Sequence, residues 1–194
     1  MTEYLLIIVG TVLVNNFVLV RFLGVCPFLG VSQKTDSALG MGFAVIFVMS
    51  VSSVLTYALY SFVLVPLGLE YLMTIAFVIV IAALVQIVEV VLKKTSPAIY
   101  ESLGVYLPLI STNCAVLGVT LLNITDISTI DNIGKALLNG LGSGAGFTLA
   151  LVLMAGIRER MEGAQIPEAF KGFPITLIAA AIMAMAFAAF SGII

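Results

Sequence analysis

Long apolar stretches without charged residues constrain this chain more than any other feature. Reading between charges separates six of them, each near or above the roughly 20 residues that a helix needs to cross a bilayer. Only 9% of the residues are charged, whereas a soluble domain carries about a quarter. Because backbone polar groups in lipid must be satisfied within a segment, we predict an all-α integral membrane protein with six transmembrane helices. The predicted spans are Tyr4–Val20, Ser37–Leu69, Tyr71–Leu92, Ser102–Thr125, Ala136–Ile157 and Gly172–Ile194.

Two apolar stretches do not have the length of a simple crossing. Ser37–Leu69 is too long for one, and the sequence Pro66-Leu67-Gly68 marks its exit. Phe22–Gln33 is charge-free but too short to span alone, so it must continue the first helix after a break or re-enter the membrane. The start, "MTEYLLIIVG", lacks the basic region and cleavage site of a signal peptide. We expect it to be retained in the first span.

The basic residues are distributed unevenly between the two predicted sides of the membrane. Six spans place both termini on one side, and that side holds only Lys135. By the positive-inside bias, the other side is predicted to be cytoplasmic and both termini to lie outside the cytoplasm. No basic run could follow a phosphate backbone, so nucleic acid is not an expected partner. The seven basic residues of the predicted cytoplasmic side are Arg21, Lys34, Lys93, Lys94, Arg158, Arg160 and Lys171.

Three short similarities recur in the same order in the two halves of the chain. "GVCPFLGV" (24–31) shares the frame Cys-x-x-Leu-Gly-Val with "NCAVLGV" (113–119). "GFAVIFVM" (42–49) is similar to "GFTLALVLM" (146–154), and "IAALVQI" (81–87) to "IAAAIMA" (178–184). We therefore predict one membrane domain, 1–194, made of repeats at about 1–97 and 98–194. Three spans in each repeat make the second inverted relative to the first, with broken first and fourth helices.

The two cysteines lie where half-helices are predicted to begin. Pro27 follows Cys26, and proline is favoured at the first position of a helix, so Cys26 is predicted to be an N-cap. Ser111, Thr112 and Asn113 are N-cap formers that precede Cys114, and Pro108 disrupts the turn before them. A helix N-terminus lowers the pKa of a thiol, so both positions could hold a thiolate. The alternative is that both are small buried apolar residues, as free cysteines often are.

The donor set limits the chemistry of these thiols. The chain has no histidine, which largely excludes zinc sites and Ser-His or Cys-His catalysis. A [2Fe–2S] cluster takes four cysteine thiolates, and this chain supplies two. A complete cluster would need two more from a partner or from a second copy. A disulfide between Cys26 and Cys114 stays open, although it would leave their symmetry unexplained.

Three stretches resemble a known family of membrane subunits. They are "VGTVLVNNFVLVRFLGVCPFLGVS", "KKTSPAIYESLGVYLPLISTNCAVLGV" and "IRERM". They resemble the A subunits of the Rnf electron-transport complexes, which are ion-translocating ferredoxin:NAD+ oxidoreductases. They are similar also to the E subunits of the sodium-translocating NADH:quinone oxidoreductases. The resemblance covers essentially the whole chain, and both cysteine motifs match.

The resemblance implies a six-helix subunit of the bacterial inner membrane. It implies pairing with a homologous subunit of opposite topology, and a [2Fe–2S] cluster held at their interface by Cys26 and Cys114 with two partner cysteines. The cluster would pass electrons between the flavin and iron–sulfur subunits of the complex. Ferredoxin oxidation and NAD+ reduction would occur on other subunits, so no catalytic residue is expected in this chain.

Other polar residues within the spans have two interpretations each. Glu89 lies one helical turn before Lys93, which favours an interfacial pair over a gate for a coupling cation. For Asn15 and Asn16, which fall inside the first span, hydrogen bonding between helices is favoured over ion binding along an ion path. The segment "GLGSGAG" (140–146) lacks the Lys-Ser/Thr ending of a phosphate loop, and the spacing of Gly142 and Gly146 favours close helix packing.

Three functions remain in competition at this level. The first is an electron-transfer subunit that holds half of a cluster. The second is a secondary transporter for an ion or small molecule, since inverted repeats and broken helices fit it as well. The third is a structural scaffold with inert thiols. Bound iron separates the first from the others, and uptake by the isolated chain would identify the second.

Overall fold

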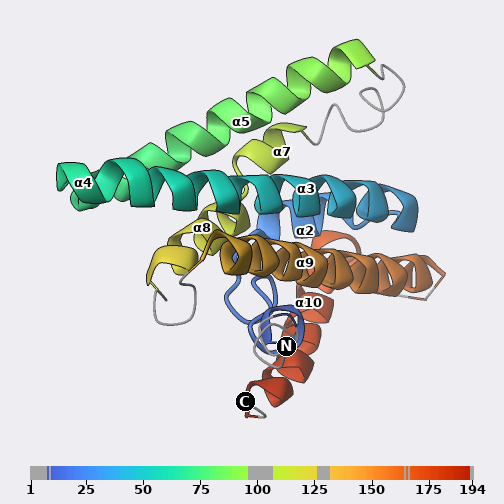
Figure 1. The fold of residues 1–194 in the computed structure, drawn as a ribbon. Coiled ribbons are helices and arrows are strands. Elements are labelled where there is room, and N and C mark those ends of the chain that lie inside the picture. The colour runs from blue at the N-terminus through green and yellow to red at the C-terminus, as the bar shows by residue number, and fades with distance from the viewer. Residues whose placement is uncertain are drawn as a thin grey trace.

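The computed structural model describes residues 8, 10–95, 107–125, 132–163, 165 and 167–192. Every regular element in these ranges is a helix (Figure 1), which confirms the all-α class. The start of the first predicted span, Tyr4–Val20, and the start of the fourth, Ser102–Thr125, lie outside the described residues.

Four described helices are long and apolar enough to cross a membrane. A fifth apolar helix, α10, is shorter. The regular elements are η1 (Gly10–Val14), α2 (Val25–Val31), α3 (Thr35–Leu59), η2 (Tyr60–Leu64), α4 (Val65–Leu67), η3 (Glu70–Leu72), α5 (Met73–Thr95), α7 (Leu107–Ser111), α8 (Cys114–Thr125), α9 (Ile133–Glu162), η4 (Glu168–Phe170), α10 (Phe173–Ala188) and η5 (Ala189–Gly192).

The antiparallel pair of α3 and α9 forms the centre of the bundle (Figure 1). At one end, the backbone N–H and the hydroxyl of Thr35 donate to Oε1 of Glu159 at 2.8 and 2.6 Å. Further along, a Cβ added to Gly144 would lie 2.8 Å from the Cα of Ile46, and Gly140 is equally tight against α3. Glycines thus let the two backbones approach closely, as is typical of helix pairs in membranes.

The long helix that begins at Thr35 ends where the sequence predicts. The α-helical, π-helical and final α-helical parts run without a gap to Leu67, which corresponds to about 50 Å at the usual rise per residue. Pro66 has no N–H to give the preceding turn, and the preceding segment, η2, is π-helical. Gly68 then ends the helix with a φ of 65° and donates its N–H to the carbonyl of Val65.

Helices α5 and α10 form the outer layers of the bundle. Figure 1 shows α5 beyond α3 and α10 beyond α9. Both present apolar side chains outward, including Ile79 and Ile87 on α5 and Ile182 and Met185 on α10, all more than half exposed. Apolar exposure of this extent suits lipid or a membrane partner rather than water. The largest fully buried side chains include Phe28, Phe77, Phe147, Met41, Met49, Leu151 and Met154.

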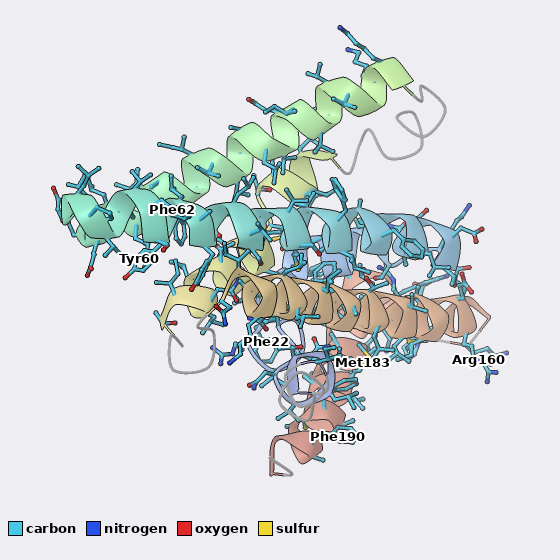
Figure 2. All side chains as sticks on the ribbon, in the orientation of Figure 1. Phe22, Tyr60, Phe62, Arg160, Met183 and Phe190 are labelled. Carbon is cyan, nitrogen blue, oxygen red and sulfur yellow. The ribbon has the colours of Figure 1, made fainter. Side chains whose placement is uncertain are left out.

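The basic residues that the sequence places on one side gather at one end of the bundle, except for Arg21. Lys34 and Arg160 lie where α3 begins and α9 ends, and Figure 2 shows Arg160 at that end. Arg21 does not join them, because it lies between Asn16 and Gly24, and both of these contact the middle of α9. Its guanidinium instead lies 6.0 Å from the centre of the Phe17 ring. The sequence prediction grouped Arg21 with the loop because it ended the first span at Val20.

Candidate cofactor site at the two cysteine tips

The first cysteine lies in the first turn of the short helix α2. The helix begins at Val25, so Cys26 is its second residue and not the predicted N-cap. Gly24 takes the N-cap position with a φ of 79° and no side-chain cap. This left-handed conformation favours glycine. Pro27 is the third residue of the helix, and a missing N–H is tolerated anywhere in the first turn. The position of the proline therefore did not identify the first residue of the helix.

The second cysteine is the first residue of α8, as predicted. Asn113 precedes it, and its side-chain oxygen accepts the N–H of Ala115 at 3.0 Å, which is a capping interaction. The hydroxyl of Thr112 turns the other way and donates to the carbonyl of Pro108 at 2.9 Å. Of the predicted capping residues, Asn113 therefore serves α8, while Thr112 satisfies the end of α7.

The first turns of α2 and α8, which carry Cys26 and Cys114 and are called the cysteine tips below, lie against each other. A Cβ added to Gly24 would lie 2.8 Å from Oδ1 of Asn113 and 3.1 Å from the Cβ of Ala115. These two residues flank Cys114 on both sides, and Gly24 stands two residues before Cys26. Segments that are far apart in the sequence thus bring the starts of α2 and α8 together.

Both tips are level with the middle of α9. The same added Cβ on Gly24 would lie 2.9 Å from Cε2 of Phe147, and Phe147 is fully buried. Phe147 stands halfway along α9, which has 30 residues. One residue earlier, the carbonyl of Gly146 accepts a hydrogen bond of 2.8 Å from the Asn16 amide. The break in the first helix is therefore held against the centre of α9.

Asn16 satisfies the backbone where the first helix breaks. Its side chain is fully buried, and its oxygen accepts the N–H groups of Val18 and Leu19 at 3.1 and 3.4 Å. Its amide also donates to the carbonyl of Val12. The bond to Gly146 joins two helices, as the sequence favours, and the other bonds are local. The neighbouring Asn15 is exposed. A place for either residue on an ion path stays a prediction.

Glu89 lies in α5, one of the outer helices, and not in either of the tip helices. It is half-buried four residues before the exposed Lys93, near the end of the helix. Its pairing with Lys93 and its role as a cation gate both stay predictions.

Both thiols are free and exposed. They are therefore neither buried apolar residues nor a disulfide in this structure. The sulfur of Cys114 lies 4.0 Å from the carbonyl oxygen of Thr112. Within the described ranges, no three Cys, Asp or Glu side chains gather as metal ligands. A [2Fe–2S] cluster at the tips would need two further cysteines from another chain, because the sequence contains only these two.

Sequence reasoning missed the residue that supports the other end of α2. Nη1 of Arg158, near the end of α9, donates to the carbonyl of Leu29 at 2.8 Å and to the hydroxyl of Ser32 at 3.0 Å. A cation at a helix C-terminus satisfies open carbonyls and opposes the helix dipole. The two partners are more than 120 residues apart in sequence, so no local pattern could have indicated this contact.

Glycines 142 and 146 pack as the sequence predicts. A Cβ added to Gly146 would lie 3.1 Å from the Cα of Val12, and one added to Gly142 would collide with the Thr11 hydroxyl. Both belong to the interior of α9. The segment 140–146 is therefore a helix-packing surface.

Comparison with known proteins agrees with this architecture. The family model described as "Rnf-Nqr subunit, membrane protein" matches residues 4–194. The chain is 56% identical over 186 residues to the A subunit of the Na(+)-translocating ferredoxin:NAD(+) oxidoreductase complex of Acetobacterium woodii, covering 96% of this chain and 95% of that protein. It is 55% identical over 194 residues to the A subunit of the ion-translocating oxidoreductase complex of Yersinia enterocolitica, covering 100% of this chain and 99% of that protein. The chain therefore belongs to the Rnf-Nqr family of membrane subunits.

Proposed function

We propose that this chain is the A subunit of an ion-translocating ferredoxin:NAD+ oxidoreductase complex and carries electrons through the membrane. Cys26 and Cys114 would hold two of the four ligand positions of a [2Fe–2S] cluster, and a homologous subunit would supply the other two. The cluster would contribute one-electron transfer between redox groups on the two sides. The names of the full-length relatives support the assignment to the complex.

The contact of Gly24 with both neighbours of Cys114 is the observation that carries this proposal. It brings the starts of two half-helices together, and each start presents one exposed thiol. Two exposed thiols at adjacent tips suit a group shared across an interface. A single-chain site would instead need more ligands than the described residues bring together.

The local backbone suits an anionic group. Four thiolates around an oxidised [2Fe–2S] core leave a net charge of about −2, and an uncompensated charge in lipid is costly. N–H groups in the first turn of a helix have no partner within the helix. The starts of α2 and α8 both direct such groups to the cysteine end, although Asn113 already takes the N–H of Ala115. The rest of the compensation would come from the partner's matching tips.

The arrangement of the long helices supports an inverted-repeat plan. Helices α3 and α9 contain the similar segments 42–49 and 146–154 and run antiparallel in contact. Inversion of the second repeat would produce this relation. On this plan the chain has six spans, the tips lie near the bilayer midplane, and a partner of opposite topology would present its own tips there.

The cluster assignment is tested on the purified complex with Cys26→Ala and Cys114→Ala. We expect each variant to lose the paramagnetic signal of the reduced cluster and about two iron atoms, since a [2Fe–2S] core needs four thiolates. Electron flow through the complex should stop while the flavin subunits remain reducible. Thr112→Ala alters an exposed neighbour of Cys114 and should keep the iron. A full iron content and normal flux in either cysteine variant would contradict the proposal and favour a transporter.

The predicted orientation has its own test. A reporter active only in the cytoplasm, fused to the C-terminus, should give no signal, because six of the basic residues gather away from the terminal side. The same reporter inserted after Glu162, where α9 ends, should be active. A strong signal from the C-terminal fusion would overturn both the topology and the inverted repeat.

A further inference from the structure

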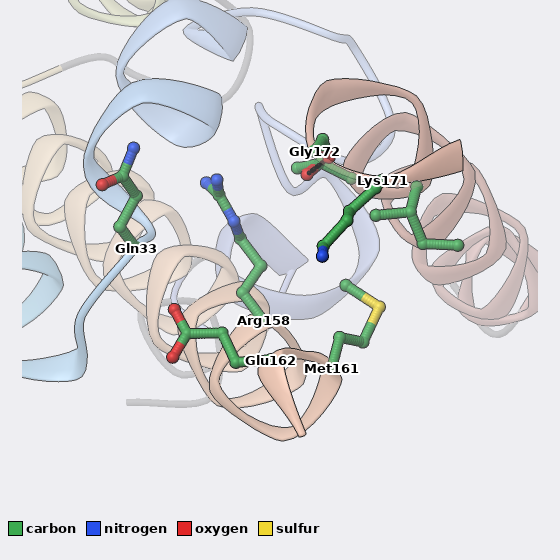
Figure 3. Close-up of a pocket in the computed structure, with 8 residues that line it drawn as sticks. Gln33, Arg158, Met161, Glu162, Lys171 and Gly172 are labelled. Atoms are coloured by element: carbon green, nitrogen blue, oxygen red, sulfur yellow. Dashed lines mark hydrogen bonds between the residues drawn. The ribbon is translucent and has the colours of Figure 1, made fainter. Parts of the chain in front are cut away.

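A cavity of about 290 Å³ opens at the basic end of the bundle, away from the cysteine tips. It lies between the segment after α2, the last turn of α9 and the start of α10. Figure 3 shows the side chains of Arg158 and Lys171 entering it from different elements. Its lining residues are Gln33, Arg158, Met161, Glu162, Lys171, Gly172, Ile175 and Thr176.

The charges of this cavity are not balanced. Two cations and one carboxylate, Glu162, line it. Among the residues that the structure describes, no ion pair joins Glu162 to either cation. Arg158 uses Nη1 to hold Leu29 and Ser32, which fixes the position of its guanidinium, whereas Lys171 is exposed. A fixed Arg and an exposed Lys facing one hollow form an incomplete anion site, because a phosphate accepts hydrogen bonds from both.

Exposed apolar side chains stand on α10 next in sequence to residues that line the cavity. Phe173 and Leu177 stand one turn apart at the start of α10 and are 62% and 45% exposed. Met161 and Ile175 contribute apolar atoms to the lining itself. A free anion would gain nothing from this surface, whereas the acyl chains of a lipid could cover it. The cavity therefore combines a site for a charged headgroup with a neighbouring surface for hydrocarbon.

We propose that this cavity binds the phosphate of an anionic phospholipid, with Arg158 and Lys171 as its cationic ligands. Basic pockets between membrane helices select such headgroups. Arg158 also holds the C-terminal end of α2, and Cys26 lies at the other end of that helix. A lipid bound here would thus fasten the start of α10 to the element that presents one of the thiols. The proposal depends on the membrane location of the chain and not on the cluster.

The test uses the purified, delipidated complex and a phosphatidylglycerol that carries a photoreactive group beside its phosphate. Illumination should produce crosslinks at Met161 or Ile175, identified by peptide mass spectrometry. Unlabelled phosphatidylglycerol should suppress them at lower concentration than phosphatidylcholine. Inorganic phosphate at the same concentrations should not suppress them, because it lacks the chains.

The matched pair of variants is Lys171→Gln and Arg160→Gln. Both remove one positive charge from the same end of the bundle, but Arg160 does not line the cavity. One cation near the headgroup is worth about a fivefold change in affinity, so Lys171→Gln should need about fivefold more phosphatidylglycerol for half-maximal crosslinking. Arg160→Gln should match the unmodified complex, and Lys171→Arg should restore binding. Equal shifts for both Gln variants, equal competition by phosphatidylcholine, or displacement by inorganic phosphate would each overturn the proposal.

Discussion

The two cysteine tips share one sequence frame but are held in place by different means. The helix that contains Cys26 has seven residues, is preceded by a left-handed glycine and is supported at its end by Arg158. The helix that begins at Cys114 has twelve residues and a side-chain cap from Asn113. The shared glycines differ as well: a Cβ added to Gly30 would have nothing within 4 Å, whereas one added to Gly118 would lie 2.6 Å from Cδ1 of Leu23. Similar motifs can therefore occupy equivalent places while depending on unlike contacts.

The largest effect is expected where the two tips touch. Gly24→Ala would combine a left-handed conformation, which costs about 1–2 kcal/mol, with a collision that costs about 1–3 kcal/mol. Its Cβ would meet Asn113 and Phe147. We expect about 2–5 kcal/mol of destabilisation in SDS titration of the protein in mixed micelles. Gly30→Ala, in the same short helix with open space around it, should change stability by about 1 kcal/mol or less.

A smaller effect should separate the two tips. Arg158→Met removes the donor to Leu29 and Ser32, and a hydrogen bond from a charged group is worth about 1.5–3 kcal/mol. This contact supports only α2. In the variant chain purified without its partner subunits, maleimide should therefore label Cys26 faster than in the unmodified chain, while labelling of Cys114 stays unchanged. Arg160→Met is the control, since Arg160 is exposed and should change little. Equal acceleration at both cysteines would show that the tips are not supported independently.

The cap of α8 gives the converse comparison. Asn113→Ala removes the acceptor for the N–H of Ala115, which should cost about 1 kcal/mol. Amide hydrogen exchange should become faster in the first turn of α8 and stay the same in the last turn of α2. Asn113→Ser keeps a capping oxygen and should restore much of the protection. Faster exchange throughout both helices would contradict this division.

The smallest effect is expected on α5, outside the tips. Glu89→Gln would remove the predicted pair with Lys93, worth about 0.2–0.5 kcal/mol. In proteoliposomes that hold the complex, both electron transfer and ion transport should persist. Loss of ion transport with electron transfer retained would make Glu89 a coupling residue and would end the interpretation as an interfacial pair.

Much of the architecture followed from local patterns. Apolar length predicted the long helices, and Pro66 with Gly68 predicted where the second one ends. The polar run before Cys114 predicted the start of α8, because a cap acts on the residues that follow it directly. The same reasoning was wrong for Cys26, where Pro27 tolerates several first-turn positions and the helix begins at Val25. Arg21 also lies apart from the other basic residues, because its position depends on how the broken helix folds back.

The sequence by itself determined which segments are apolar enough for lipid, where helices can end and which residues carry thiols, because these depend on composition and on neighbours within a turn. Only the tertiary structure decided that Gly24 meets Asn113, that Asn16 fastens the break to the middle of α9 and that Arg158 supports α2. These contacts join residues more than 80 positions apart. The packing of whole helices selects these partners, together with the need to give hydrogen bonds to backbone N–H and C=O groups where a helix breaks or ends. Neither requirement leaves a periodic signal along the chain.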